Sequence, residues 1–218
     1  MNNVRHSTRL ARWISRIAFA CVVAVAAPLT ASADPILATT PSGLLWAFDG
    51  TMGFKFDVLG DNFLVTRLGF YDTSGDGLES SHDIGIWAES GGAPLATATL
   101  SAGTGATLEA EFRWVDLVLP LLLNANTSYV IGATFVDFDF SDGARDTALI
   151  DPMFSVVDAA YYAGGAGLNF PNIQYPNLQG FFGPNLSGIA SVPDGGSALA
   201  LLGLGMIGLS TLRRKLRK

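Results

Sequence analysis

The chain has 218 residues and a formal net charge of −6, but its charges are unevenly placed. Between residues 34 and 192, 18 acidic residues accompany only four basic ones, which gives this segment a formal charge of −14. A surface of that sign repels phosphate backbones and argues against nucleic acid as a partner. The length allows one domain of ordinary size together with targeting segments.

The first 33 residues have the three zones of a secretory signal peptide. A basic start precedes the apolar stretch 17–29, and the small residues Ala31 and Ala33 supply a cleavage site. The stretch is shorter than the roughly 20 residues that a membrane-spanning helix requires, which disfavours the alternative of an uncleaved anchor. We therefore expect residues 1–33 to direct export and to be removed by signal peptidase, so that Asp34 becomes the mature N-terminus.

The only cysteine, Cys21, lies inside that apolar stretch. Removal of the signal peptide would leave a mature chain without a thiol. Disulfides, cysteine nucleophiles and thiolate metal sites are then excluded, and the domain has to be stabilised by its hydrophobic core.

Residues 34–185 predict an all-β domain, a single antiparallel β-sandwich of jelly-roll-like form. In 52–58 the apolar residues alternate, which places Phe54 and Phe56 on one face of a strand. Short runs with turn residues between them are typical of a sandwich, and a closed barrel is the lesser alternative. Trp87 and Trp114 occupy strand positions expected in the core. The other predicted strands are 63–71, 83–88, 95–100, 112–119 and 127–137.

Residues 161–185 differ in composition, because Gly, Asn, Pro and aromatic residues dominate there. We expect an irregular segment that packs aromatic rings on the sandwich, with a binding surface as the alternative. Residues 186–191 are expected to be a linker. Tyr161, Tyr162 and Tyr175 are candidate glycan-stacking residues, because carbohydrate-binding sandwiches place sugar rings on exposed aromatic side chains.

A possible calcium loop follows the second predicted strand. Asp72, Ser74, Asp76 and Asp83 stand at the first, third, fifth and twelfth positions, and Gly77 at the sixth, as in a calcium-binding loop. Ser74 replaces an acidic or amide residue, and strands rather than helices flank the loop. The alternative is a Gly-Asp-Gly turn between two strands.

Catalytic machinery is not predicted. His82 is the one histidine outside the signal peptide, and neither a serine nor a cysteine motif accompanies it. A strand-entry histidine of this kind more often serves packing or hydrogen bonding than general-base catalysis. We therefore expect no catalytic residues and no enzymatic activity.

Residues 192–218 form three consecutive parts. An apolar segment at 198–212 is expected to be a short membrane helix, and the basic cluster at 213–218 would stay in the cytoplasm. The box that precedes them reads Val192, Pro193, Asp194, Gly195 and Gly196.

Residues 192–218, from here on called the sorting tail, resemble the PEP-CTERM sorting signal, and proteins that carry this signal are substrates of exosortases. The family's box is Val-Pro-Glu-Pro-like, so Asp194 and Gly195 depart from it. The resemblance implies processing near Pro193 by an exosortase, transient residence in the inner membrane and a final location at the cell surface or outside the cell. It also implies a host that makes exopolysaccharide. The alternative is an ordinary tail anchor in the cell envelope.

Residues 69–87 are similar to a β-sandwich domain of unknown function found in exported bacterial proteins. The similarity rests on Gly-Phe-Tyr-Asp, Gly-Asp-Gly-Leu and Gly-Ile-Trp in this segment, and on the later Tyr-Val-Ile-Gly at 129–132. Together the two resemblances imply a non-enzymatic structural or interaction protein of the cell envelope or extracellular matrix. A carbohydrate-binding module is the alternative function.

Overall fold

The computed structural model describes residues 34–39, 49–72, 74–135, 141–143, 149–162, 164–175 and 180–191. The chain divides into units 1–31 and 32–218, and every described residue belongs to the second unit. The expected signal peptide, residues 1–33, and the sorting tail, residues 192–218, both fall outside the described ranges. Within the described ranges, all regular elements are β-strands, and no helix there is long and apolar enough to cross a membrane.

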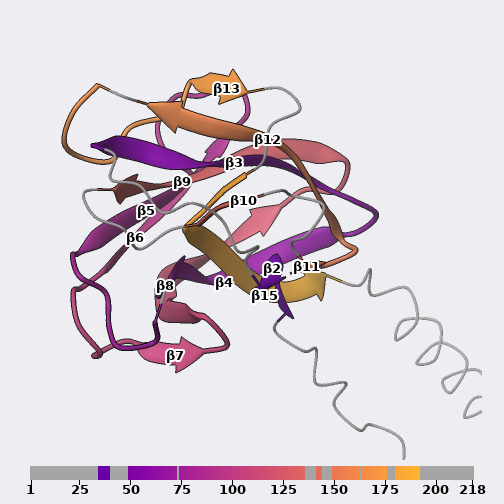
Figure 1. Cartoon of the computed structure of the whole chain (residues 1–218). Coiled ribbons are helices and arrows are strands. Elements are labelled where there is room, and N and C mark those ends of the chain that lie inside the picture. Colours follow the sequence, from indigo (N-terminus) through magenta and orange to yellow (C-terminus); the bar gives the residue numbers. More distant parts are fainter. Residues whose placement is uncertain are drawn as a thin grey trace, which may run out of the picture. The chain divides into compact units, whose positions relative to one another are not determined.

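Two principal sheets, both antiparallel, account for most of the strands (Figure 1). The five-stranded sheet has the order β1 (Asp34–Pro35), β15 (Pro184–Ser191), β4 (Asn62–Tyr71), β8 (Phe112–Leu123) and β7 (Thr107–Glu109). The six-stranded sheet has the order β13 (Ile173–Tyr175), β12 (Phe154–Tyr162), β3 (Gly50–Val58), β9 (Thr127–Phe135), β5 (His82–Ala88) and β6 (Ala96–Leu100).

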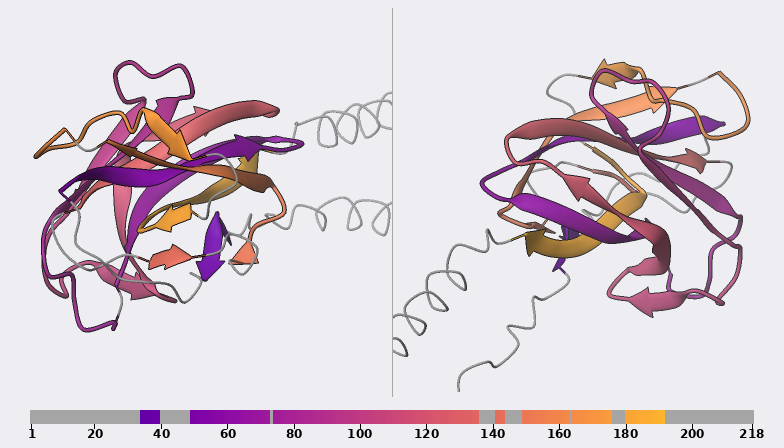
Figure 2. Two further views of the ribbon diagram at one scale, coloured as in Figure 1. Left: turned by 45° about the horizontal axis from the view of Figure 1, so that its top comes forward. Right: turned by 180° about the vertical axis from the view of Figure 1, so that it is seen from behind.

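Two small antiparallel pairs complete the described strands. β2 (Leu37–Thr39) pairs with β11 (Leu149–Ile150), and β10 (Ser141–Gly143) pairs with β14 (Gly180–Phe182). The two principal sheets form separate layers (Figure 1), and Figure 2 shows the same strands from two further directions.

The alternating pattern of the sequence becomes the buried face of each sheet. In β3 the four residues Met52, Phe54, Phe56 and Val58 are all 0% exposed, as their period of two predicts. Full burial of one such side chain contributes about 1.5–3 kcal/mol. In β4 the corresponding residues are Phe63, Val65, Leu68 and Phe70.

Aromatic contacts join the two sheets into one core. The ring centroids of Phe63 in β4 and Phe154 in β12 are 4.9 Å apart. Those of Phe70 in β4 and Phe135 in β9 are 5.2 Å apart. Strand pairing does not join the two principal sheets in the described residues. The arrangement therefore fits a β-sandwich rather than the closed barrel.

Both tryptophans expected in the core are buried, but only Trp114 belongs to the core cluster, and Trp87 lies outside it. Trp87 is 1% exposed and Trp114 is 6% exposed. Each ring lies over a glycine of its own sheet, because a Cβ at Gly85 or Gly69 would come within 2.6 Å of the Trp87 or Trp114 ring, respectively. Trp87 also contacts Phe170 at 6.1 Å between centroids, so an aromatic ring of segment 161–185 packs on the sheet as expected. The segment is not irregular throughout, because it contains β13 and β14.

The prediction of a linker at residues 186–191 is wrong, because these residues form most of β15. This strand lies between β1 and β4, and Leu186 is 0% exposed in the core. The sandwich therefore extends to Ser191 rather than ending at residue 185. The physical reason is that β4 needs a hydrogen-bonding neighbour on this side, which outweighs the weak strand propensity of the segment.

β8 is longer than predicted and contains a large bulge. Leu121 pairs with Val65 and Asp116 pairs with Arg67, so four residues, 117–120, stand opposite the single residue Thr66. Such bulges bend a strand and redirect its side chains. Here Val118 is 98% exposed and Leu119 is 80% exposed.

Candidate functional site

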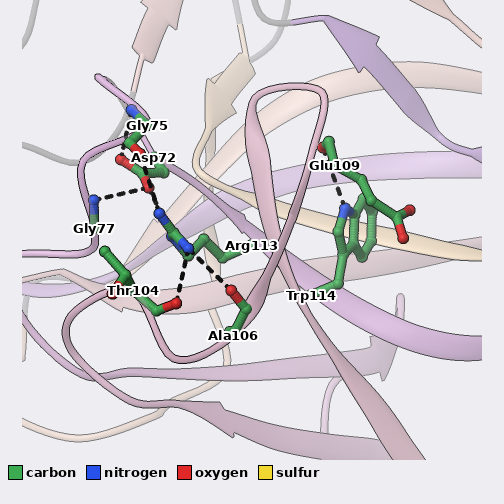
Figure 3. A network of polar contacts seen from close by, with 8 residues as sticks. All are labelled: Asp72, Gly75, Gly77, Thr104, Ala106, Glu109, Arg113 and Trp114. Carbon is green, nitrogen blue, oxygen red and sulfur yellow. Dashed lines mark hydrogen bonds and ion pairs between the residues drawn. The ribbon is translucent and has the colours of Figure 1, made fainter.

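Asp72, the first residue of the candidate calcium loop, is a buried acceptor that closes the loop on itself (Figure 3). Its Oδ1 accepts a hydrogen bond from the backbone amide of Gly75 at 2.9 Å, and its Oδ2 accepts one from Gly77 at 3.1 Å. Gly75 and Gly77 have φ values of 70° and 118°, which glycine adopts without strain. The Asp-Gly composition therefore produces a tight turn.

Arg113 of β8 completes this polar site, and the local sequence pattern around Asp72 does not predict it. Its Nε donates to Asp72 Oδ2 at 2.7 Å, and both side chains are buried, at 4% and 2% exposure. Its Nη1 donates to the backbone oxygens of Thr104 and Ala106, and its Nη2 donates to that of Gly75 (Figure 3). One guanidinium thus ties the loop after β4 to the segment before β7, which is the work of a structural ion pair.

In the described ranges, the other three candidate calcium ligands form no hydrogen bond or ion pair with the Asp72 side chain or with one another. Ser74 and Asp76 are exposed in the loop, whereas Asp83 lies on β5 and accepts a hydrogen bond from Thr99 at 2.6 Å. No group of three His, Cys, Asp or Glu side chains suited to a metal occurs among the described residues. The carboxylate of Asp72 has Arg113 as its partner, and calcium binding stays a prediction.

His82 has a packing environment. It is 0% exposed, its ring stacks on that of Phe70 at 3.8 Å, and its Nδ1 lies 2.8 Å from the backbone oxygen of Thr134. These contacts match the packing and hydrogen-bonding role expected from its position at the start of a strand.

The candidate glycan residues do not form one platform. Tyr161 and Tyr162 are consecutive in β12, so their side chains point to opposite faces of the sheet. Tyr161 packs against the core and meets Phe181 edge-on at 6.4 Å, whereas Tyr162 covers Gly164. The backbone of Tyr175 lies in β13 opposite Ala159, and its side chain does not belong to the described part of the structure.

A second polar site lies on the outer face of the five-stranded sheet. Arg67 of β4 places its guanidinium carbon 4.7 Å from the ring centroid of Trp114, and its Nη2 lies 2.6 Å from the Glu109 carboxylate. The hydrogen bond from Arg67 lowers the pKa of Glu109, and the charge of Arg67 adds to this effect. Glu109 is half exposed, so the pair is a surface contact.

The expected signal peptide and the sorting tail are each joined in sequence to one of two neighbouring strands, β1 and β15. β15 ends at Ser191, which pairs with Asn62, and the box residue Val192 follows directly. β1 is antiparallel to β15 and begins at Asp34 opposite Gly188. Because antiparallel neighbours place the start of one strand beside the end of the other, β1 begins at the same end of the sheet at which β15 ends. The sites expected for both cleavages thus flank one end of the sandwich.

The box, apolar segment and basic cluster that follow β15 are the parts of a C-terminal sorting signal of exported proteins. Residues 191–216 match the family described as the VPDSG-CTERM motif. This is a PEP-CTERM-type sorting signal, and it indicates an exported, exosortase-sorted protein. Gly195 stands where the description has Ser, and Asp194 agrees with it, which explains the departure from the Val-Pro-Glu-Pro-like box. No curated protein matches the chain.

Proposed function

We propose that the protein is a non-enzymatic structural or interaction component of the cell envelope or extracellular matrix, sorted by an exosortase and associated with exopolysaccharide. The observation that carries the proposal is the match of residues 191–216 to the VPDSG-CTERM motif, directly after β15. In this account signal peptidase cuts after Ala33, the segment 198–212 enters the inner membrane, and the exosortase cuts near Pro193. The product is released to the surface or outside the cell.

The polar residues of the sandwich support a structural role. The charged groups of Asp72 and Arg113 bind each other and backbone groups, and His82 is packed between aromatic rings. Charged groups that are buried and hydrogen-bonded, as those of Asp72 and Arg113 are, stabilise a fold and are not free to act on a substrate. The proposed role therefore depends on the surface of the domain and on where it is delivered.

The fold proposed for this role is a jelly roll. A jelly roll has eight strands in two four-stranded sheets. We assign the strands β1-β15-β4-β8 to one of these sheets and β3-β9-β5-β6 to the other, in the order in which they pair. β7 extends the first sheet, and β12 and β13 extend the second. The chain crosses between the sheets from β3 to β4 and again from β4 to β5, as in that fold.

The test is fractionation of the full chain in a bacterium with and without the cognate exosortase. We expect the parent protein outside the cell or at its surface only when the exosortase is present. A Pro193→Ala, Asp194→Ala variant should remain in the inner membrane with its basic tail attached in both strains. Equal release of parent and variant in both strains would contradict exosortase sorting.

A further inference from the structure

The bulge in β8 creates an apolar surface that the sandwich does not cover. Val118, Leu119 and Leu122 are 98%, 80% and 47% exposed, and we call these three residues the β8 patch. Large apolar side chains exposed together mark a contact surface, because water solvates them poorly. Pro120 lies between them and has no backbone N–H, so this segment is a poor edge for adding another strand.

The patch continues across the sheet toward the sorting tail. Leu122 pairs with Leu64 of β4, and Leu64 pairs with Ile189 of β15, so the three side chains form one cross-strand row. Leu64 and Ile189 are half-buried, and they lie on the face away from the core, since their neighbours Phe63 and Val65 are buried in it. The row ends two residues before Ser191.

The sorting tail limits how far this surface can be from a membrane. Only six residues, 192–197, separate Ser191 from the apolar segment that begins at Ala198. Even a fully extended chain spans at most about 25 Å over these seven steps. The start of β1 lies at the same end of the sheet, so the expected signal peptide tethers the same end before its removal.

We propose that, until the tail is cut, the β8 patch lies against the phospholipid bilayer in which the sorting tail is embedded. The inference rests on the proposed function. Contact with lipid covers Val118, Leu119 and Leu122 and holds the box region close to the membrane surface. Cutting the tail removes the tether, and the domain leaves.

The charge of the domain decides the kind of contact. The segment 34–192 has a formal charge of −14, and Asp116, next to the bulge, is exposed. Anionic headgroups therefore repel the domain, and the contact is made by apolar side chains inserted at the headgroup boundary. Three such side chains bind weakly alone, so the contact persists only while the tail supplies the tether.

The experiment uses the full chain with Cys21→Ser, since Cys21 is the only cysteine. Leu119→Cys, labelled with an environment-sensitive fluorophore, is reconstituted into vesicles of phosphatidylethanolamine and phosphatidylglycerol. The matched control is Leu108→Cys, also an exposed leucine, at 39%, on β7. β7 pairs with residues 112–114 of β8, at the end of the sheet away from Ser191. Unchanged urea midpoints for both variants show that the labels leave the fold intact.

We expect the label at position 119 to shift its emission to the blue and to lose intensity with brominated lipid, and the label at 108 to do neither. If the protein floats with the vesicles but the label at position 119 keeps the emission of a water-exposed fluorophore, the inference is wrong and the proposed function stands. A chain that does not float overturns both. A blue shift at 119 that needs no vesicles and grows with protein concentration assigns the patch to a second copy of the chain, and also overturns the inference.

Discussion

Among single residues, Arg113 has the most consequential position. Its guanidinium makes hydrogen bonds to the Asp72 carboxylate and to three backbone oxygens while both charged side chains are buried. A buried carboxylate that loses its cationic partner remains desolvated without compensation, which is far more costly than the loss of an exposed ion pair. The turn after β4 therefore depends on a side chain from another strand.

Replacing Arg113 tests this dependence. In Arg113→Met the carboxylate of Asp72 stays buried without a counter-charge, and we expect the free energy of unfolding to fall by about 3–5 kcal/mol. Urea denaturation of the processed protein measures it. The matched control is Arg67→Met, which removes an arginine that contacts a half-exposed Glu109, and there we expect a loss of about 1 kcal/mol or less. Equal losses in the two variants would argue against the structural role of the Asp72–Arg113 pair.

The Arg67–Glu109 contact predicts a pH dependence. Because the hydrogen bond and charge of Arg67 lower the folded-state pKa of Glu109, this pair stabilises the protein above the pKa of the unfolded state. That stabilisation is lost as the pH falls through the lowered, folded-state pKa. In Arg67→Met we expect the pKa of Glu109 to rise into the usual glutamate range, measured by NMR titration of its carboxyl carbon. A pKa that does not move would show that Arg67 has no influence on Glu109 in solution.

The sequence identified the polar loop but not its partner. Asp72 and Gly77 were recognisable because Asp and Gly recur at turn spacing, and this local pattern is shared by cation loops and simple turns. Arg113 is 41 residues from Asp72, so local spacing could not connect them. One signal was available: Arg113 is one of four basic residues in 34–192 and lies between Phe112 and Trp114 in a strand, where an arginine needs a buried partner.

Among the elements, the strands with strong alternation were predictable, and those held by their neighbours were not. β3, β4, β5 and β9 appear close to their predicted bounds because alternating apolar side chains determine a buried face. β15 has the sequence PNLSGIAS, in which only Leu186 reaches the core, and its strand form comes from pairing with β1 and β4. Pairing across more than 100 residues leaves no periodic signal in a single sequence.

Leu186 gives a test at this scale. It is 0% exposed in the middle of β15, so Leu186→Ala should leave a cavity and lower the free energy of unfolding by about 2–5 kcal/mol. Ile189→Ala, in the same strand but on the outer face, should cost on the order of 1 kcal/mol. Thermal unfolding of both variants compares them. A Leu186→Ala protein as stable as the parent would mean that residues 186–191 act as the linker first expected and not as a core strand.

For the whole molecule, the sorting signal was predictable because its box, apolar segment and basic cluster are consecutive in the sequence. The position of its junction with the domain was not, because it depends on the pairing of β1 with β15 between residues 34–35 and 187–188. That pairing brings the start of β1 to the end of the sheet at which β15 ends. Both expected cleavage sites therefore adjoin the same end of the sandwich.

The most direct test of export and exosortase sorting is the intact mass of the mature protein. It is measured in membrane and external fractions of a host that has the matching exosortase. We expect an external species that begins at Asp34 and ends near Pro193, with no tail sequence remaining. A single membrane-bound species that retains residues 213–218 would contradict exosortase sorting and would make the protein a tail-anchored component of the envelope.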